Sequence, residues 1–173
     1  RIARSSRNMG QMITDMLELL RVVRVDLEPV PVDMVALAQS VVETLSPQTN
    51  HARIDIQPMP QAMGDATLLR QVLSNLIDNG LKYSRHLAQP ELAMGFDSVQ
   101  RAYFVRDNGM GFDMAHAEKL FGLFQRLHTG SNVPGMGVGL AIVARIVERH
   151  GGRVWAESAP GEGATFWLRL PLG

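Results

Sequence analysis

The stretch "NLIDNGLKYS", residues 75–84, places two asparagines, a lysine and a tyrosine inside a segment that otherwise has the apolar spacing of a helix. The expected core-facing stripe of that helix recurs at helical intervals and consists of Leu69, Val72, Leu73, Leu76 and Ile77. At about 100° per residue, Asn75, Asn79 and Lys82 lie within roughly 60° of one another and beside this stripe. The segment therefore predicts an amphipathic helix with a polar ridge next to the core.

The chemistry of this ridge has two interpretations. A single asparagine at such a position is most simply a solvated helix edge. Amide oxygens are also hard ligands of the kind that Mg²⁺ accepts, and a lysine presents a compact positive charge to phosphate oxygens. The ridge by itself leaves both interpretations open.

A glycine-containing turn follows a predicted strand in "VRDNGMGFD", residues 105–113. Asp107 at the strand end is a hydrogen-bond acceptor, and Gly109 and Gly111 let the backbone approach a flat ligand closely. The alternative is an ordinary Asp-Asn-Gly turn without a ligand.

A second glycine-rich stretch, "GMGVGLAIV" at residues 135–143, opens a predicted helix. Free N–H groups and the helix dipole favour an anion there, although a flexible loop leading into a helix has the same pattern. Neither the Walker A phosphate loop nor the dinucleotide-binding fingerprint is present, and serine-hydrolase and zinc-protease motifs are also missing. A nucleotide site of another kind remains.

Composition narrows the class of protein. The 173 residues suffice for one domain with a core, and 17 basic residues balance 17 acidic ones, so no net charge favours nucleic acid or an anionic membrane. Cysteine is absent, which excludes disulfides, a thiol nucleophile and cysteine-based zinc sites. No apolar run approaches the roughly 18 residues of a membrane span. The chain starts at Arg1 rather than at methionine, so we expect a fragment of a longer protein.

The N-terminal segment predicts a separate helix with a heptad seam of Ile2, Met9, Ile13, Met16, Leu20 and Val23. Such a helix either packs on its own domain or belongs to a helical bundle or dimer. Two prolines in "DLEPVPVD", residues 26–33, end it, and we place the domain boundary between 26 and 27.

The remaining segments alternate between helical and strand patterns. Helices are expected at 33–46, from residue 65 through the ridge, at 114–121 and at 139–150, with Asp33 and Asp65 as caps. Strands are expected at 53–57, 91–96 and 101–106, and 153–170 has the pattern of a hairpin with a glycine turn. This order predicts an α+β fold, with a mixed sheet and helices packed on one of its faces.

The three polar stretches, in this order and together with "LFGLFQRLH" at 120–128, resemble the N, G1, F and G2 boxes of the sensor histidine kinase ATP-binding domain. That domain has the Bergerat fold of gyrase, Hsp90 and mismatch-repair ATPases. The resemblance covers about residues 30–171 and is greatest to phytochrome-like soluble sensor kinases. It implies a two-layer α/β sandwich with a mixed, mostly antiparallel sheet, preceded by an N-terminal helix.

The resemblance also implies a role for each site residue. Asp107 would accept the adenine amino hydrogen, Gly109 and Gly111 would pass beneath the base, and Tyr83 would pack along the adenine or ribose. Asn79 would coordinate Mg²⁺, with Asn75 in the same phosphate pocket. The remaining expected contacts to ATP are Lys82, Phe121, Phe124, Arg126, Gly135, Gly137, Gly139, Leu140 and Thr165, of which Lys82 and Arg126, with Asn75, are the catalytic candidates.

Asn75 stands where the hydrolysing relatives of this superfamily carry a glutamate that activates water. An amide does not accept a proton at neutral pH, so we expect a poor ATPase that instead transfers the γ-phosphoryl group to a histidine. No acidic residue in the family's pattern follows any of the five histidines, His51, His86, His116, His128 and His150. We therefore expect the phosphoacceptor to lie on a helical hairpin outside this chain, with residues 1–26 as the C-terminal part of that hairpin and 27–173 as the ATP-binding domain.

The implied partners are that dimerisation hairpin and the receiver domain of a response regulator, in a cytoplasmic and homodimeric full-length protein. No contact with nucleic acid or membrane is expected of this chain. Three alternatives remain open: a non-catalytic nucleotide-binding module of the same fold, an anti-sigma-type serine kinase, and a structural domain whose glycine motifs are only turns. Gly80 departs from the family, which more often has alanine there.

Overall fold

The computed structural model describes residues 2–45, 51–125 and 137–173. Its helices are α1 (Ile2–Arg24), α2 (Met34–Thr44), α4 (Ala66–Ser84), α5 (Gly139–Arg149) and the 3-10 helix η1 (Met114–Lys119). Its strands are β1 (Val30–Val32), β2 (Arg53–Ile56), β3 (Ala62–Gly64), β4 (Glu91–Asp97), β5 (Ala102–Asp107), β6 (Arg153–Ser158) and β7 (Ala164–Arg169).

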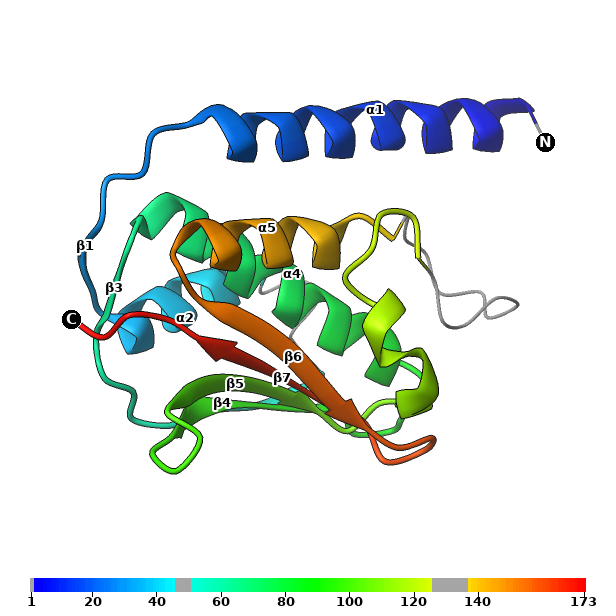
Figure 1. Ribbon diagram of the computed structural model, residues 1–173. Coiled ribbons are helices and arrows are strands. Elements are labelled where there is room, and N and C mark those ends of the chain that lie inside the picture. Colours follow the sequence, from blue (N-terminus) through cyan, green and yellow to red (C-terminus); the bar gives the residue numbers. More distant parts are fainter. Residues whose placement is uncertain (1, 46–50, 126–136) are drawn as a thin grey trace.

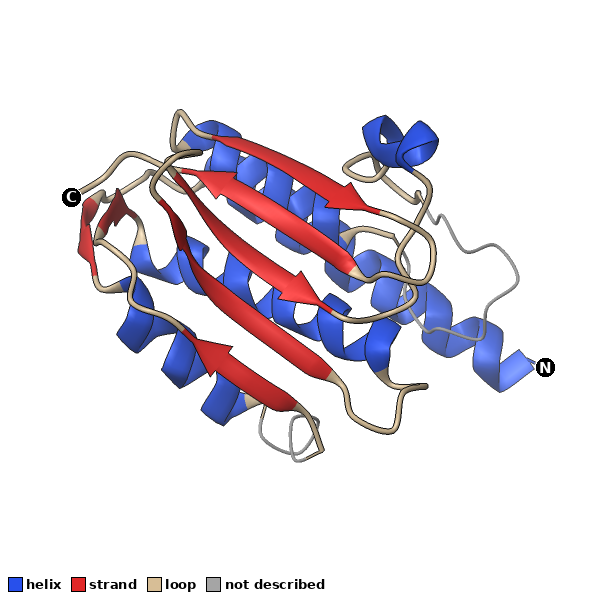
Figure 2. Cartoon of the chain, turned by 90° about the horizontal axis from the view of Figure 1, so that it is seen from below, coloured by secondary structure: helices blue, strands red, loops and turns tan. Residues whose placement is uncertain are grey.

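The main sheet has five strands in the order β2-β4-β5-β7-β6. Only β2 and β4 are parallel; the other neighbouring pairs are antiparallel. Helices α2, α4 and α5 cover one face of this sheet, and none of the described helices lies on the opposite face (Figures 1 and 2). The sequence-based prediction of an α+β sandwich with a mixed sheet and one helical layer is therefore confirmed.

The core lies between the sheet and the helical layer. The entire predicted stripe of α4 is buried there. Asp33 and Asp65 cap α2 and α4 as predicted, because their carboxylates accept hydrogen bonds from the free N–H groups of the first turn. These caps place the start of α4 beside the small antiparallel sheet of β1 and β3.

The open face of the sheet has a small aromatic cluster of its own. Phe104 of β5 packs edge to face against Trp167 of β7, and Trp167 stacks on Trp155 of β6. The guanidinium groups of Arg153 and Arg169 both lie over the Trp155 ring. Cation–π contacts and the aliphatic stems of the arginines shield these rings from water on the uncovered face.

Helix α1 lies along α5, on the side of the helical layer away from the sheet (Figure 1). The side chains that face the domain are Val22, which is buried, and Leu19, which packs against the core. The predicted heptad seam points elsewhere: Met9, Ile13, Met16, Leu20 and Val23 are all exposed, and the side chain of Ile2 lies outside the described part. The helix therefore packs on its own domain through a different face and leaves these seam side chains uncovered.

Three elements, β1, β3 and the helix near residue 114, differ from the sequence-based prediction. Residues 26–33 were expected only to interrupt the chain, yet Val30–Val32 forms β1 and pairs with Ala62–Gly64. The extended backbone that prolines impose suits an edge strand, which explains the pairing. The predicted helix at 114–121 is a shorter 3-10 helix, capped by Asp113. Among the described residues, no helix combines the length and apolar character needed to cross a bilayer.

Replacing Leu76 by alanine is expected to destabilise the domain by about 2–5 kcal/mol, because this α4 side chain is 1% exposed and its loss leaves a cavity. Urea unfolding followed by tryptophan fluorescence measures the effect. The control is Val99→Ala, whose side chain is 91% exposed and should shift the midpoint little. Equal midpoints for the two variants would contradict the assignment of α4 to the core.

Candidate functional site

The polar ridge of α4 lies beside the buried stripe, as its spacing predicted. Asn75, Asn79 and Lys82 are all half-buried. The Lys82 ammonium forms an ion pair with the Asp78 carboxylate one turn earlier, at 2.6 Å. Because this pair is partly exposed to water, it contributes little stability and leaves the ammonium available to a stronger anion.

Asn75 connects this ridge to the start of α5. A Cβ atom built on Gly139 would lie 3.5 Å from the Asn75 Oδ1 atom, so the asparagine amide faces the first residue of α5. The Asn75 Nδ2 group is buried and makes no hydrogen bond within the part of the chain that the structure describes. A buried donor without an acceptor is unfavourable, so this position is suited to a ligand that supplies an oxygen.

Asp107, the last residue of β5, is buried beside the same helix. Its side chain is close to Gly80 of α4, where an added Cβ would lie 3.4 Å from the Asp107 Cβ and 2.4 Å from Leu92 Cδ2. Glycine at position 80 thus has a packing reason: it lets α4 approach β4 and β5 at the carboxylate. The structure accordingly brings the ridge and the Asp-Asn-Gly turn to one place.

The burial of Asp107 changes its acid–base behaviour. Desolvation raises its pKa from the ordinary value of 3.8 to about 6, although hydrogen bonds from the N–H groups of Gly109 and Ala164 act to lower it. Because the folded pKa is the higher one, this carboxyl favours the folded state most at low pH, and that contribution is lost as the pH rises from about 4 to 6. The carboxylate is held here at an energetic cost, as is common at functional sites.

The turn after β5 is locked to the end of α4. The N–H of Gly109 donates to Asp107 Oδ1 at 2.8 Å, and the N–H of Met110 donates to the Tyr83 carbonyl at 3.1 Å. A Cβ on Gly109 would lie 2.6 Å from that carbonyl oxygen. Only glycine allows the turn to sit this close to the helix.

The glycine turn between β6 and β7 supports the other side of the Asp107 turn. Gly163 has φ of +76°, and a Cβ there would lie 2.0 Å from the Asp107 carbonyl oxygen. Ser158 accepts a hydrogen bond from the N–H of Phe112 at 2.9 Å and donates one to the Gly163 carbonyl at 2.6 Å. The sequence analysis did not single out Ser158, whose only signal is its place before a glycine turn.

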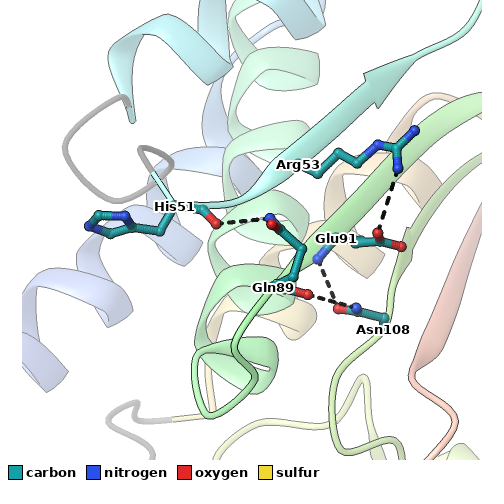
Figure 3. Close-up of polar contacts among 5 residues, drawn as sticks. All are labelled: His51, Arg53, Gln89, Glu91 and Asn108. Atoms are coloured by element: carbon teal, nitrogen blue, oxygen red, sulfur yellow. Dashed lines mark hydrogen bonds and ion pairs between the residues drawn. The ribbon is translucent and has the colours of Figure 1, made fainter.

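Asn108 has a different role from its neighbours in the Asp-Asn-Gly turn. Figure 3 shows its side chain accepting a hydrogen bond from the N–H of Glu91 at 2.8 Å and donating one to the Gln89 carbonyl at 3.1 Å. The Gln89 side chain donates in turn to the His51 carbonyl at 3.2 Å, and Glu91 lies 3.9 Å from Arg53 across the β2–β4 pair. Asn108 therefore anchors the turn to the start of β4, away from the polar ridge.

Of the segment that leads into α5, the structure describes residues up to 125 and from 137 onward, and these two ends are in contact. The N–H of Phe124 donates to the Gly137 carbonyl at 2.9 Å, and a Cβ on Gly137 would lie 2.6 Å from the Gln125 carbonyl oxygen. Phe121 packs edge to face on Phe166 of β7, with ring centroids 6.5 Å apart, whereas Phe124 is exposed. Arg126 and Gly135, two of the predicted contacts, lie outside the described residues.

Two of the predicted nucleotide contacts lie elsewhere: Thr165 is on the open face of the sheet, and Leu140 packs against the core. Thr165 pairs with Arg106, and its hydroxyl accepts from the Arg106 Nε at 3.1 Å. Side chains alternate along a strand, so Thr165 points to the open face of the sheet and Ala164 is the residue opposite Asp107. The expected contact of Thr165 with the nucleotide is therefore not supported. Leu140 is half-buried and packs against the core at the start of α5.

A metal ion at this site would depend on few protein ligands. Among the described residues, no group of three or more histidine, aspartate or glutamate side chains is arranged to bind a metal. The half-buried Asn79 amide offers one hard oxygen next to Asp78 and Lys82 on α4. Mg²⁺ commonly takes one or two protein ligands and completes its shell with water and phosphate oxygens, and this residue set fits that mode.

The family model and the sequence relatives of this chain all indicate the same protein family. Residues 64–173 match the model of the histidine kinase-, DNA gyrase B- and HSP90-like ATPases. Phytochrome-like protein Cph1 from Synechocystis sp. is 43% identical over 124 residues, which are 70% of this chain and 16% of that protein. Adaptive-response sensory kinase SasA from Thermosynechococcus vestitus is 34% identical over 175 residues, 96% of this chain and 46% of that protein. The chain thus spans less than half the length of these relatives.

Solved structures agree with the sequence relatives. Full-length ShkA in complex with AMPPNP superposes with a TM-score of 0.77 at 27% identity, covering 98% of this chain and 37% of that one. The mycobacterial sensor histidine kinase MprB superposes with a TM-score of 0.73 at 24% identity, covering 83% and 98%, and supports the fold alone.

Gly163→Ala is expected to destabilise the domain by about 3 kcal/mol or more. An alanine at this position is strained by the positive φ, and its Cβ would also displace the backbone at Asp107. Gly161→Ala is the matched control: its φ is +81° but nothing lies within 4 Å, so only strain of roughly 1–2 kcal/mol is expected. Chemical unfolding of both variants measures the difference. A Gly163 variant as stable as the Gly161 variant would show that the two turns do not depend on each other.

Proposed function

Because the chain belongs to the histidine kinase-, DNA gyrase B- and HSP90-like ATPase family, we propose that it is the catalytic ATP-binding part of a two-component sensor histidine kinase. In this proposal it binds Mg²⁺ and ATP and transfers the γ-phosphoryl group to a histidine on a hairpin outside this chain. The proposal is carried by one observation: the buried Asp107 carboxylate and the unpartnered Asn75 amide lie along the same helix, beside glycines of two separate segments.

Asp107 is suited to recognise adenine. Its Oδ1 atom accepts from the Gly109 N–H, and the Ala164 N–H also donates to the carboxylate. A carboxylate has about four acceptor positions, so it can also accept from the exocyclic amino group of the base. Guanine presents a carbonyl at that position, and two acceptors would then face each other. Gly109 and Gly111 allow the base to approach the backbone closely.

The α4 ridge and the start of α5 are suited to the phosphates. Asn75 would donate its free N–H to a phosphate oxygen, Lys82 would exchange Asp78 for phosphate, and Asn79 would hold Mg²⁺. The N–H groups opening α5 at Gly139 add a helix dipole that favours negative charge. We also retain Gly137, Phe121 and Phe124, together with Arg126 and Gly135 from outside the described residues, as proposed contacts.

The proposed reaction follows from the fact that the Asn75 amide cannot act as a base at neutral pH. Bound ATP supplies the phosphoryl group and its ADP leaving group. Transfer forms a bond between phosphorus and an imidazole nitrogen as the bond to the ADP oxygen breaks, so it requires alignment and charge neutralisation from the protein. Hydrolysis needs a base for water, and the Asn75 amide does not provide one at neutral pH. A histidine brought to the site is therefore the preferred acceptor.

The exposed seam of α1 supports a larger assembly. We propose that residues 1–26 continue a dimerisation hairpin and that 27–173 form the ATP-binding domain. The apolar side chains of Met9, Ile13, Met16, Leu20 and Val23 would then pack within a helical bundle. The proposed full-length protein is a homodimer that passes phosphate to a response regulator receiver domain, in the cytoplasm where ATP is present.

Asp107→Asn is expected to weaken ATP binding about 10- to 100-fold, the effect of losing a hydrogen bond to a charged group. The Gly109 N–H retains the amide oxygen, so the new NH₂ group would face the adenine amino group, donor against donor. Titration calorimetry with Mg²⁺ and ATP measures this, with the exposed Asp55→Asn as control.

The raised pKa of Asp107 adds a pH dependence to this prediction. Adenine stabilises the anion, so ATP binding should release protons near pH 6, and affinity should fall as the pH drops from 7 to 5. Asp107→Asn should remove the dependence attributable to this residue. Calorimetry in buffers of different ionisation enthalpy detects the released protons; unchanged affinity and proton release in the variant would exclude Asp107 as the base-recognising group.

Mixing the chain with a separately produced hairpin of a related histidine kinase and labelled ATP should give acid-labile, base-stable phosphate on the hairpin. ATP hydrolysis by the chain alone should stay low. Tight ATP binding without phosphohistidine, even with hairpins from several relatives, would favour a non-catalytic nucleotide-binding module. Acid-stable phosphate on a serine would favour the anti-sigma type of kinase.

A further inference from the structure

The last residue of α5 joins the domain to α1. The two terminal nitrogens of the Arg149 guanidinium donate to the carbonyls of Val22 and Val25, the second at 2.5 Å. These carbonyls belong to the C-terminal turn of α1 and the residue after it, where no further helical N–H groups are available to them. A planar cation with two parallel donors suits two such carbonyls and the negative end of the helix dipole.

The next residue, His150, joins the same corner to α4. Its Nε2 atom accepts from the Asp65 N–H at 3.0 Å, while Nδ1 lies 2.7 Å from the Ile146 carbonyl. The Asp65 side chain caps α4 and also accepts from the N–H of Glu28, in the segment that follows α1. Two consecutive residues thus connect the end of α1 with the far ends of both helices that line the proposed nucleotide site.

Apolar packing of α1 on the domain is limited among the side chains that the structure describes: only Val22 is buried, and Leu19 is half-buried against the core. A fully buried valine contributes about 1.5–3 kcal/mol. The paired Arg149 contacts therefore add substantially to what fixes the orientation of α1. A polar contact of this kind can break and re-form without exposing a large apolar surface.

We infer that Arg149 is a positioning residue, which fixes the orientation of α1, and of any hairpin continuing from it, relative to the ATP-binding domain. This inference rests on the proposed function for its purpose, because phosphoryl transfer requires the hairpin histidine and the γ-phosphate to meet. Arg149 lies at the opposite end of α5 from Gly139, so it acts on orientation and makes no contact with the nucleotide.

Spin labels test this orientation directly, since the chain has no cysteine of its own. One label replaces Met9 of α1 and the other Val99 at the β4–β5 turn, which are 64% and 91% exposed. Double electron–electron resonance should give one narrow distance distribution in the parent. Arg149→Gln should broaden or shift it, and Arg149→Lys should have an intermediate effect because a lysine keeps the charge but not the paired donors.

Arg145→Gln is the matched control, since Arg145 lies one turn earlier on α5 and, among the described residues, forms its ion pair with Glu148 on the surface, at 2.6 Å. It should retain the narrow distribution. A broad distribution in the parent, or a distribution that Arg149→Gln leaves unchanged, would overturn the inference. ATP affinity should stay within about twofold in all variants; absence of ATP binding in the parent would refute the proposed function while leaving the distance result to decide the role of Arg149. Unfolding by urea confirms that each variant is folded.

Discussion

Three glycines from three separate segments surround Asp107, and the rest of the site depends on this close approach. Side-chain carbons at Gly80, Gly109 and Gly163 would lie 3.4, 2.8 and 2.0 Å from the Cβ, the Oδ1 and the carbonyl oxygen of Asp107, respectively. Helix α4, the turn after β5 and the turn before β7 therefore meet at one carboxylate. An interior is packed too densely to accommodate even one added methyl group at such a point without displacing a neighbour.

The same packing explains the chemistry of the site. Enclosure by backbone removes water from the Asp107 carboxylate and raises its pKa, while the Gly109 N–H preserves one fixed hydrogen bond. Backbone N–H groups of Gly109 and Ala164 thus hold the carboxylate in place, and it keeps further acceptor positions for a ligand. The proposed phosphate end is built differently, from an amide, an ion-paired lysine and a helix start, whose polar groups can exchange partners. Under the proposed function, a rigid end for the base and an adaptable end for the phosphates would suit a domain that binds one nucleotide and releases another.

Helices α4 and α5, which line the proposed site, are each held by hydrogen bonds at the end farther from it. Asp65 and His150 tie the start of α4 to the end of α5, and Arg149 ties that corner to α1. The apolar core holds the helices on the sheet with far more free energy than these few hydrogen bonds provide. The described apolar contacts of α1 with the domain are few, namely Val22 and Leu19, so motion between α1 and the domain would expose little apolar surface from these two side chains.

Much of this architecture could be predicted from local sequence, because periodicity, caps and glycine turns report on neighbours within a few residues. The stripe of α4, the caps at Asp33 and Asp65, the hairpin at the end and the mixed sheet with one helical layer were all predicted and confirmed. The polar ridge and the two glycine motifs also indicated the family, because each motif is a local pattern of residue types. Their residue types indicated acceptors, donors and close backbone approach.

Contacts between distant segments could not be predicted in this way. Strand register decides that Ala164, and not Thr165, lies opposite Asp107, and a shift of one residue reverses every side chain. The packing face of α1 is Leu19 and Val22, roughly a third of a turn from the stronger heptad seam, because the neighbouring α5 decides which face is buried. The sequence by itself determined the elements and the chemistry that each one carries. Only the tertiary structure decided which of those chemical groups meet, since that depends on how separate elements pack.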